Sequence, residues 1–248
     1  MQQVAAPVGD QASLAPARRG RRLPRKLHGY FVAFALVFAA IVLTGFSRTF
    51  FIPVARGTFA KPLIVHVHGA IFFVWTAVLV IQAILAATKR LRAHRKVGSL
   101  AGWLVLPMLV LGTIVAARDT VHDFNEGGGT AALSFFYGEL ADLAMFGLLA
   151  GGAMLMRNRP EYHKRWVILG SLGLMGAAVG RIPEVSAAGL YIFLGMIASV
   201  AAYDFASRRM VHRATVIGAA VLLVLGLTEE RIGNTTIWLS AAHRLLKV

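Results

Sequence analysis

The sequence contains no cysteine among its 248 residues. Disulfides, thiolate nucleophiles, iron–sulfur clusters and covalently attached c-type haem all need cysteine, so this absence excludes them. Metals bound by histidine and b-type haem need no thiol. Redox chemistry therefore stays open.

Charged residues are also scarce: they make up 15% of the chain, against about 25% in an average soluble domain. Hydrophobic residues make up 57%. A soluble fold could not bury so much apolar surface, whereas a bilayer accepts apolar side chains on every side of a helix. The composition predicts an integral membrane protein.

Acidic residues are the scarcest charged group, with 11 Asp and Glu against 26 Lys and Arg, so the net charge is +15. A nucleic-acid partner would be one explanation of such a charge. However, the basic residues form short clusters between apolar runs of about 20 residues, the length that crosses a bilayer. Lipid headgroups account for clusters of this kind, so we expect no nucleic-acid partner.

The apolar runs predict an all-α, polytopic bundle of about seven transmembrane helices. We expect a disordered basic tail over residues 1–27, a transmembrane domain over 28–231 and an interfacial amphipathic segment over 232–248. A glycine stripe in the fifth span predicts close helix packing there. The predicted spans are 29–48, 62–87, 97–118, 133–156, 165–183, 186–206 and 214–229.

The orientation follows from the basic residues. Eighteen of the 26 Lys and Arg fall on one side of seven alternating spans, in the tail and in the loops 89–96, 157–165 and 208–213. Cytoplasmic loops carry such an excess. We therefore predict a multi-pass protein of the bacterial inner (plasma) membrane, with its N-terminus inside and its C-terminus outside.

Two histidines open the second span. Residues two apart on a helix point about 200° apart, so His66 and His68 cannot both face one small site. Trp75 and Gln82 continue the face of His68, which favours His68 as the inward-facing residue.

The fourth span holds two acids, Glu139 and Asp142, three residues apart and therefore on one face. Two carboxylates in a bilayer need protons, a cation or an arginine. One alternative is a structural ion pair with Arg181, near Glu184. The other is an outer-side site for a metal or haem, with anion or substrate binding beside it. The metal or haem set is His68, His122, Glu139, Asp142 and His66, and the anion or substrate set is Arg181, Glu184 and Gln82.

Histidines also precede the outgoing spans on the basic side, as in His94-Arg95 and His163-Lys164-Arg165. Headgroup binding is one explanation of this pattern. The alternative is that His94 and His163 are the axial ligands of an inner haem.

The stretch His66-x-His68-Gly69, then Trp75 and Gln82, then His94-Arg95-Lys96-Val97-Gly98, resembles a bacterial family of multi-pass membrane proteins of unknown function. Those proteins share a His-Gly helix, a mid-helix glutamine and an HR-x-x-G loop. The resemblance covers roughly residues 60–105. It implies a polytopic helical fold and supplies no activity.

The chain is similar, more loosely, to b-type di-haem membrane cytochromes, which place histidines at both ends of four central helices. This similarity implies an inner pair of His94 and His163 and an outer pair of His68 and His122. The fourth span departs from that pattern because it contains no histidine.

Two hypotheses follow. The first is a redox or metal-dependent protein acting on quinone or lipid, with haem b or a transition metal (iron, zinc or copper) as cofactor. The second is a non-catalytic component, either a transporter or an accessory subunit of a membrane complex, whose buried polar residues are structural or proton-coupling. No self-sufficient catalytic motif is present, so enzymatic activity is left open. The partners expected are the bilayer, and a complex partner or a second copy.

Overall fold

The structure is a computed structural model that describes residues 29–248, and no strand occurs in that range. The predicted tail, residues 1–27, lies outside the described residues. The fold is all-helical, as predicted. The helices are α1 (Tyr30–Phe46), α2 (Ile52–Ala55), α3 (Leu63–Ala87), α4 (Leu91–Gly102), α5 (Val105–Asp123), α6 (Gly129–Phe146), α7 (Gly152–Leu155), α8 (Pro160–Leu172), α9 (Met175–Val179), α10 (Gly189–Arg208), α11 (Arg213–Gly233) and α12 (Thr236–Leu246).

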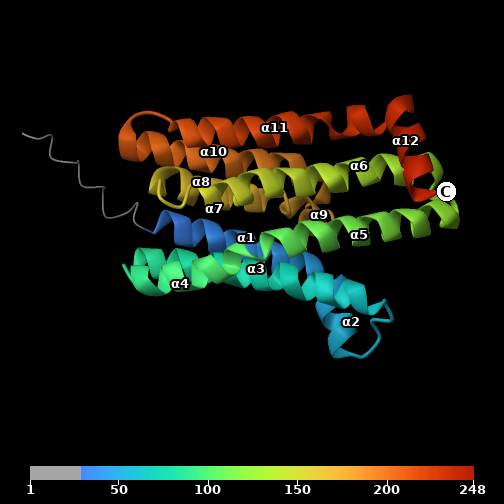
Figure 1. Ribbon diagram of the computed structural model, residues 1–248, viewed down its shortest axis with the longest axis horizontal. Helices are drawn as coiled ribbons and strands as arrows, with labels where there is room; N and C mark the ends of the chain where they lie inside the picture. The colour runs from blue at the N-terminus through green and yellow to red at the C-terminus, as the bar shows by residue number, and fades with distance from the viewer. Residues whose placement is uncertain (1–28) are drawn as a thin grey trace, which may run out of the picture.

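These helices form seven rods and a short terminal helix, because α1–α2, α4–α5, α6–α7 and α8–α9 each continue one another. Figure 1 shows the rods side by side, with consecutive rods running in opposite directions. Four helical stretches are long and apolar enough to cross a membrane: Tyr30–Ala55, Leu63–Ala87, Leu91–Leu155 and Ser186–Arg208. Which end faces the cytoplasm stays a prediction.

The long stretch Leu91–Leu155 is not one straight helix. It reverses at the glycine run between α5 and α6, where Gly127 has φ of +101° and Gly129 has φ of +50°. Glycine adopts such angles without the clash that a side chain would cause. The three glycines therefore make the turn that returns α6 alongside α5.

The interior and exterior of the bundle are both apolar. Phe38, Phe146 and Leu169 are fully buried, whereas Leu106 and Val224 on the outside are more than half exposed. In water such a surface would be unfavourable, but hydrocarbon solvates it. The pattern agrees with a helical membrane protein.

The glycine stripe of α8 and α9 packs closely, as predicted. A side chain at Gly170 would meet the backbone nitrogen of Ala150 at 2.7 Å, and one at Gly173 would meet the carbonyl oxygen of Asp142 at 2.9 Å. Because glycine has no side chain, α8 can lie directly against α6 and the segment that follows α6.

The fifth rod begins and ends earlier than predicted, because α8 starts at Pro160. The sequence predicts a span over 165–183, but α8 ends at Leu172, and α9 ends at Val179 before a 3₁₀ turn at Ser186–Ala188. Figure 1 shows α5, α6 and α11 extending past α9 toward α12. The Trp238 indole of α12 donates a hydrogen bond to the carbonyl oxygen of Leu133 at 2.8 Å. Placement of α12 at a membrane interface stays a prediction.

Candidate functional site

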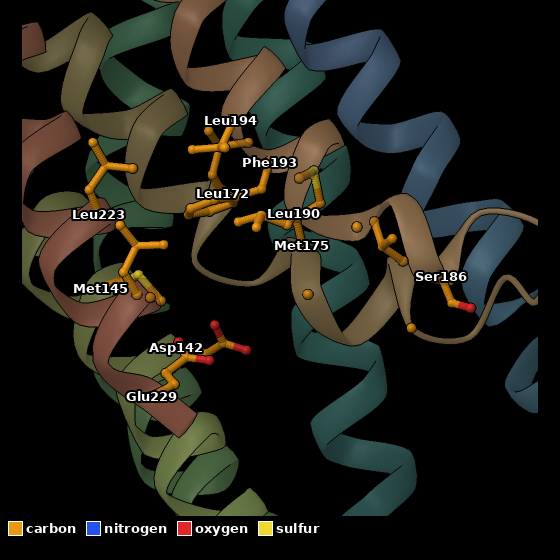
Figure 2. Close-up of a pocket in the computed structure, with 16 residues that line it drawn as sticks. Asp142, Met145, Leu172, Met175, Ser186, Leu190, Phe193, Leu194, Leu223 and Glu229 are labelled. Carbon is orange, nitrogen blue, oxygen red and sulfur yellow. The ribbon is translucent and has the colours of Figure 1, made fainter. Parts of the chain in front are cut away.

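A cavity of about 250 Å³ lies between α6, α8, α9, α10 and α11. Its walls are mainly apolar, and its two acidic groups are Asp142 of α6 and Glu229 of α11. Figure 2 shows these two carboxylates close together at one end of the apolar lining. The cavity is therefore amphipathic, with one acidic end. Six of its apolar lining residues are Met145, Leu172, Met175, Phe193, Leu194 and Leu223.

Glycines make room for both carboxylates. A Cβ at Gly176 of α9 would lie 3.3 Å from Asp142 Oδ2, and a Cβ at Gly138 of α6 would lie 3.4 Å from Glu229 Oε2. Gly138 precedes Asp142 by one helical turn, so Glu229 of α11 lies against the same face of α6 that carries Asp142. Because these positions carry no side chain, α9 packs closely against Asp142, and Glu229 packs closely against α6.

Neither acid has a cationic partner within residues 29–248. No Lys, Arg or His lines the cavity, and neither Asp142 nor Glu229 forms an ion pair. An ionised side chain in the middle of a bilayer costs about 2.5–3.5 kcal/mol on insertion scales. The pair therefore calls for protons or for a cation supplied from outside the protein.

The cavity reaches the outer surface of the bundle between α10 and α11. Leu190 and Leu227 line the cavity, and both are more than half exposed. They mark an apolar rim at the mouth of the cavity. The lining then changes from aliphatic at the rim to acidic at Asp142 and Glu229.

The sequence-predicted outer histidines lie elsewhere and face different ways, as their spacing predicts. The ring of His66 packs against Phe59, with centroids 4.9 Å apart, and His68 packs on Phe72 at 4.3 Å. Trp75 is buried on the face of His68 and donates a hydrogen bond to Ser171 Oγ at 3.1 Å. The Nδ1 atom of His68 is buried without a partner among the described residues.

The remaining predicted metal ligands do not gather around His68. His122 is exposed near the end of α5, and no hydrogen bond joins it to Asp119. Glu139 is half-buried, one turn from Asp142. In the part of the chain that the structure describes, no three His, Asp or Glu side chains are grouped so that they could hold a metal ion. The predicted outer metal or haem centre gains no support.

Arg181 does not form the structural ion pair that was the alternative. It makes no ion pair with Glu139 or Asp142; its guanidinium lies 4.7 Å from the Phe46 ring centroid and donates a hydrogen bond to the carbonyl oxygen of Ala177. Glu184 pairs instead with exposed Arg48 at 3.4 Å. The short α9 explains this result, because it ends before Arg181 and leaves that residue in the reversal.

A buried ion pair lies at the other end of the bundle, where the connections 88–90, 156–159 and 209–212 meet; we call this the basic end. Arg165 of α8 and Asp204 of α10 are both fully buried and joined through the Nε and Nη2 atoms of the arginine. Asp204 also accepts hydrogen bonds from the Thr215 hydroxyl and from the His212 backbone nitrogen. The pair ties α8, α10 and α11 together.

Three charged groups (Glu161, Lys164 and Arg208) and one imidazole surround this ion pair. Glu161 accepts hydrogen bonds from Arg165 and Lys164 and pairs with Arg208. Glu161 lies ahead of the predicted span; burial raises its pKa, but these hydrogen bonds outweigh burial and hold the pKa below its usual value. His212 caps α11, since its Nδ1 accepts from the Ala214 nitrogen at 3.0 Å.

Burial, with Arg165 and Arg208 nearby, lowers the pKa of His212, which lies in the loop before α11. The neutral imidazole is the form that can accept the capping hydrogen bond. The electrostatics of the basic end therefore favour the capped helix.

The predicted HR-x-x-G loop is helical, because it lies within α4, and it has a structural role at the same end. Gln82 of α3 donates a hydrogen bond to the carbonyl oxygen of His94 at 3.1 Å, and His94 Nδ1 lies 3.2 Å from the carbonyl oxygen of Gln82. A Cβ at Gly98 would lie 2.6 Å from Gln82 Nε2. The glutamine, histidine and glycine thus join α3 to α4. Gln82 belongs to this link and not to an outer anion site.

Sequence reasoning missed the partnership of Asp142 with Glu229 and the whole Arg165–Asp204 pair. Asp204 carried a usable signal, because it is an acid inside the apolar run that forms α10. Such a residue needs a partner. The identity of the partner was hidden, since Arg165 lies 39 residues away and reads as part of a loop cluster.

No protein family model, no curated protein and no solved structure matches this chain. The functional argument therefore depends on the geometry of the sites alone.

Proposed function

We propose that this protein is a multi-pass membrane carrier or receptor for a lipid-soluble cation, an amphiphile with an apolar body and a protonated amine. The apolar body would occupy the cavity, and Asp142 and Glu229 would accept the amine. The observation that carries the proposal is a pair of acids without a cationic partner at the end of an apolar cavity.

The size of the cavity sets the class of ligand. If each non-hydrogen atom needs about the 30 Å³ that a water molecule occupies in the liquid, 250 Å³ holds roughly eight such atoms. A short alkylamine fits this volume. Longer chains would extend through the rim at Leu190 and Leu227 into the acyl region.

Binding would exchange protons for the ligand. Two carboxylates that share a site in lipid cannot both stay ionised without a counter-charge, so in the empty protein they retain protons. An ammonium group supplies that counter-charge and releases the protons. This coupling belongs to the second sequence hypothesis, a transporter or accessory component of the bacterial inner membrane.

The test is equilibrium binding of tritiated n-octylamine to the protein in phosphatidylcholine nanodiscs. We expect saturable binding that the variants Asp142→Asn and Glu229→Gln each weaken about tenfold or more, because one lost charge contact of about 1.4 kcal/mol gives that factor. The matched control is Glu184→Gln, which removes an acid outside the cavity. Unchanged binding in both cavity variants, or equal competition by n-octanol, would overturn the proposal.

A further inference from the structure

Two imidazoles meet at the basic end, away from the carboxylate cavity. The rings of His94 in α4 and His163 in α8 have centroids 6.2 Å apart and planes at 89°. Both side chains are half-buried. Of the seven histidines that the structure describes, these are the two whose rings contact each other.

Backbone carbonyls fix the tautomer of each ring. His94 Nδ1 lies 3.2 Å from the carbonyl oxygen of Gln82, and His163 Nδ1 lies 2.9 Å from that of Ala153. A carbonyl only accepts, so Nδ1 carries the hydrogen in both rings and Nε2 carries the lone pair. Neither Nε2 has a hydrogen-bond partner among residues 29–248.

This arrangement is the one that metal-binding histidines require. Such histidines donate their other ring nitrogen to a carbonyl or carboxylate, which orients the ring and makes the free nitrogen more basic. In both rings a backbone carbonyl already occupies Nδ1, so Nε2 is the nitrogen left to coordinate a metal.

We infer that His94 and His163 together bind one transition-metal ion through their Nε2 atoms. A metal at about 2.0–2.1 Å from each nitrogen lies roughly 3.2 Å from each ring centroid. For a metal held by both Nε2 atoms, a centroid separation of 6.2 Å would correspond to an N–metal–N angle of roughly 150°. A tetrahedral site would bring the centroids to roughly 5.2 Å.

An angle as wide as this would favour one class of ion. Trans imidazoles suit the tetragonal geometry of Cu²⁺ or Ni²⁺ better than the tetrahedral geometry of Zn²⁺. Two protein ligands leave the other positions to water or to a small donor molecule. The site is therefore an open one, and it is separate from the proposed amine cavity.

The experiment is Cu²⁺ titration of the detergent-purified protein after treatment with a chelator, followed by elemental analysis and electron paramagnetic resonance. We expect one bound Cu²⁺ per chain and hyperfine coupling to two equivalent nitrogens. The variants His94→Asn and His163→Asn are chosen because asparagine can still donate to the carbonyl but has no Nε2. Each should weaken binding at least tenfold and leave the thermal unfolding temperature nearly unchanged.

His66→Asn is the matched control, since His66 lies near α2 at the opposite end, and it should bind Cu²⁺ as the parent protein does. A wild-type spectrum without two coupled nitrogens would overturn the inference, whatever the variants do. So would parent-like binding in both variants at the inner pair. A Soret band in the protein as purified would show that haem, and not a free ion, is the occupant.

Discussion

Replacing Asp204 by asparagine should destabilise the protein more than any single change to a surface charge. In the native protein, Asp204 accepts hydrogen bonds from Arg165, Thr215 and the His212 backbone nitrogen, and neither Asp204 nor Arg165 is exposed. The asparagine leaves the arginine buried with Glu161 as its one acidic neighbour.

The magnitude follows from the cost of an uncompensated buried charge, about 3–5 kcal/mol when one partner of a buried pair is removed. Glu161 remains and offsets part of that cost, so we expect about 3 kcal/mol. For a chain of this size, 1 kcal/mol shifts the unfolding temperature by about 2–4 °C, and the expected decrease is therefore roughly 6–12 °C.

The assay is reversible unfolding in mixed micelles, followed by circular dichroism and by tryptophan fluorescence. Glu184→Gln is the control: it breaks the pair with Arg48, whose side chains are 63% and 68% exposed, and should cost about 0–1 kcal/mol. The double variant Arg165→Met with Asp204→Leu should recover much of the loss, because it removes both buried charges together. A decrease below about 1 kcal/mol for Asp204→Asn would refute the argument that this pair fastens α8 to α10 and α11.

Two further predictions concern the basic end. Gly98→Ala should lower the unfolding free energy by about 1–3 kcal/mol, because its Cβ would displace the Gln82 amide from the carbonyl of His94. Faster amide hydrogen exchange in α4 would report this loss. An unchanged exchange rate would contradict the prediction. Stability should also fall as the pH drops below about 6.5, since the lowered pKa of His212 means that its neutral, capping form stabilises the fold at higher pH and protonation removes that contribution. His212→Asn keeps a capping side chain that does not titrate, so its unfolding temperature should depend less on pH in this range; an equal dependence would show that His212 is not responsible.

Much of the fold could be predicted because its cause is local in sequence. An apolar run of about 20 residues has few stable conformations in lipid other than a helix, so the seven rods follow from the composition of each segment. The opposite directions of His66 and His68 follow from helical periodicity alone. The bounds of the fifth rod and the break after α8 did not follow, because the break lies at Gly173, which packs against α6.

The candidate sites depend on the rotation and the depth of each helix, which single segments do not determine. Asp142 was predicted as a site residue, but Glu229 becomes its neighbour only because α11 packs beside α6. His122 was predicted to join it, yet α5 continues past the neighbouring rods and carries His122 into an exposed position. The inner pair, His94 and His163, was predicted from its position before two outgoing spans, and the structure does bring these rings together.

The anchoring of α10 and α11 is unequal along their length. Asp204 holds the last turns of α10 to the first turns of α11 through Thr215 and His212, whereas the far halves of these helices are separated by the cavity. The two helices are thus joined by hydrogen bonds at one end and separated by the cavity at the other. A ligand that enters between Leu190 and Leu227 therefore meets the ends of α10 and α11 that these hydrogen bonds do not join.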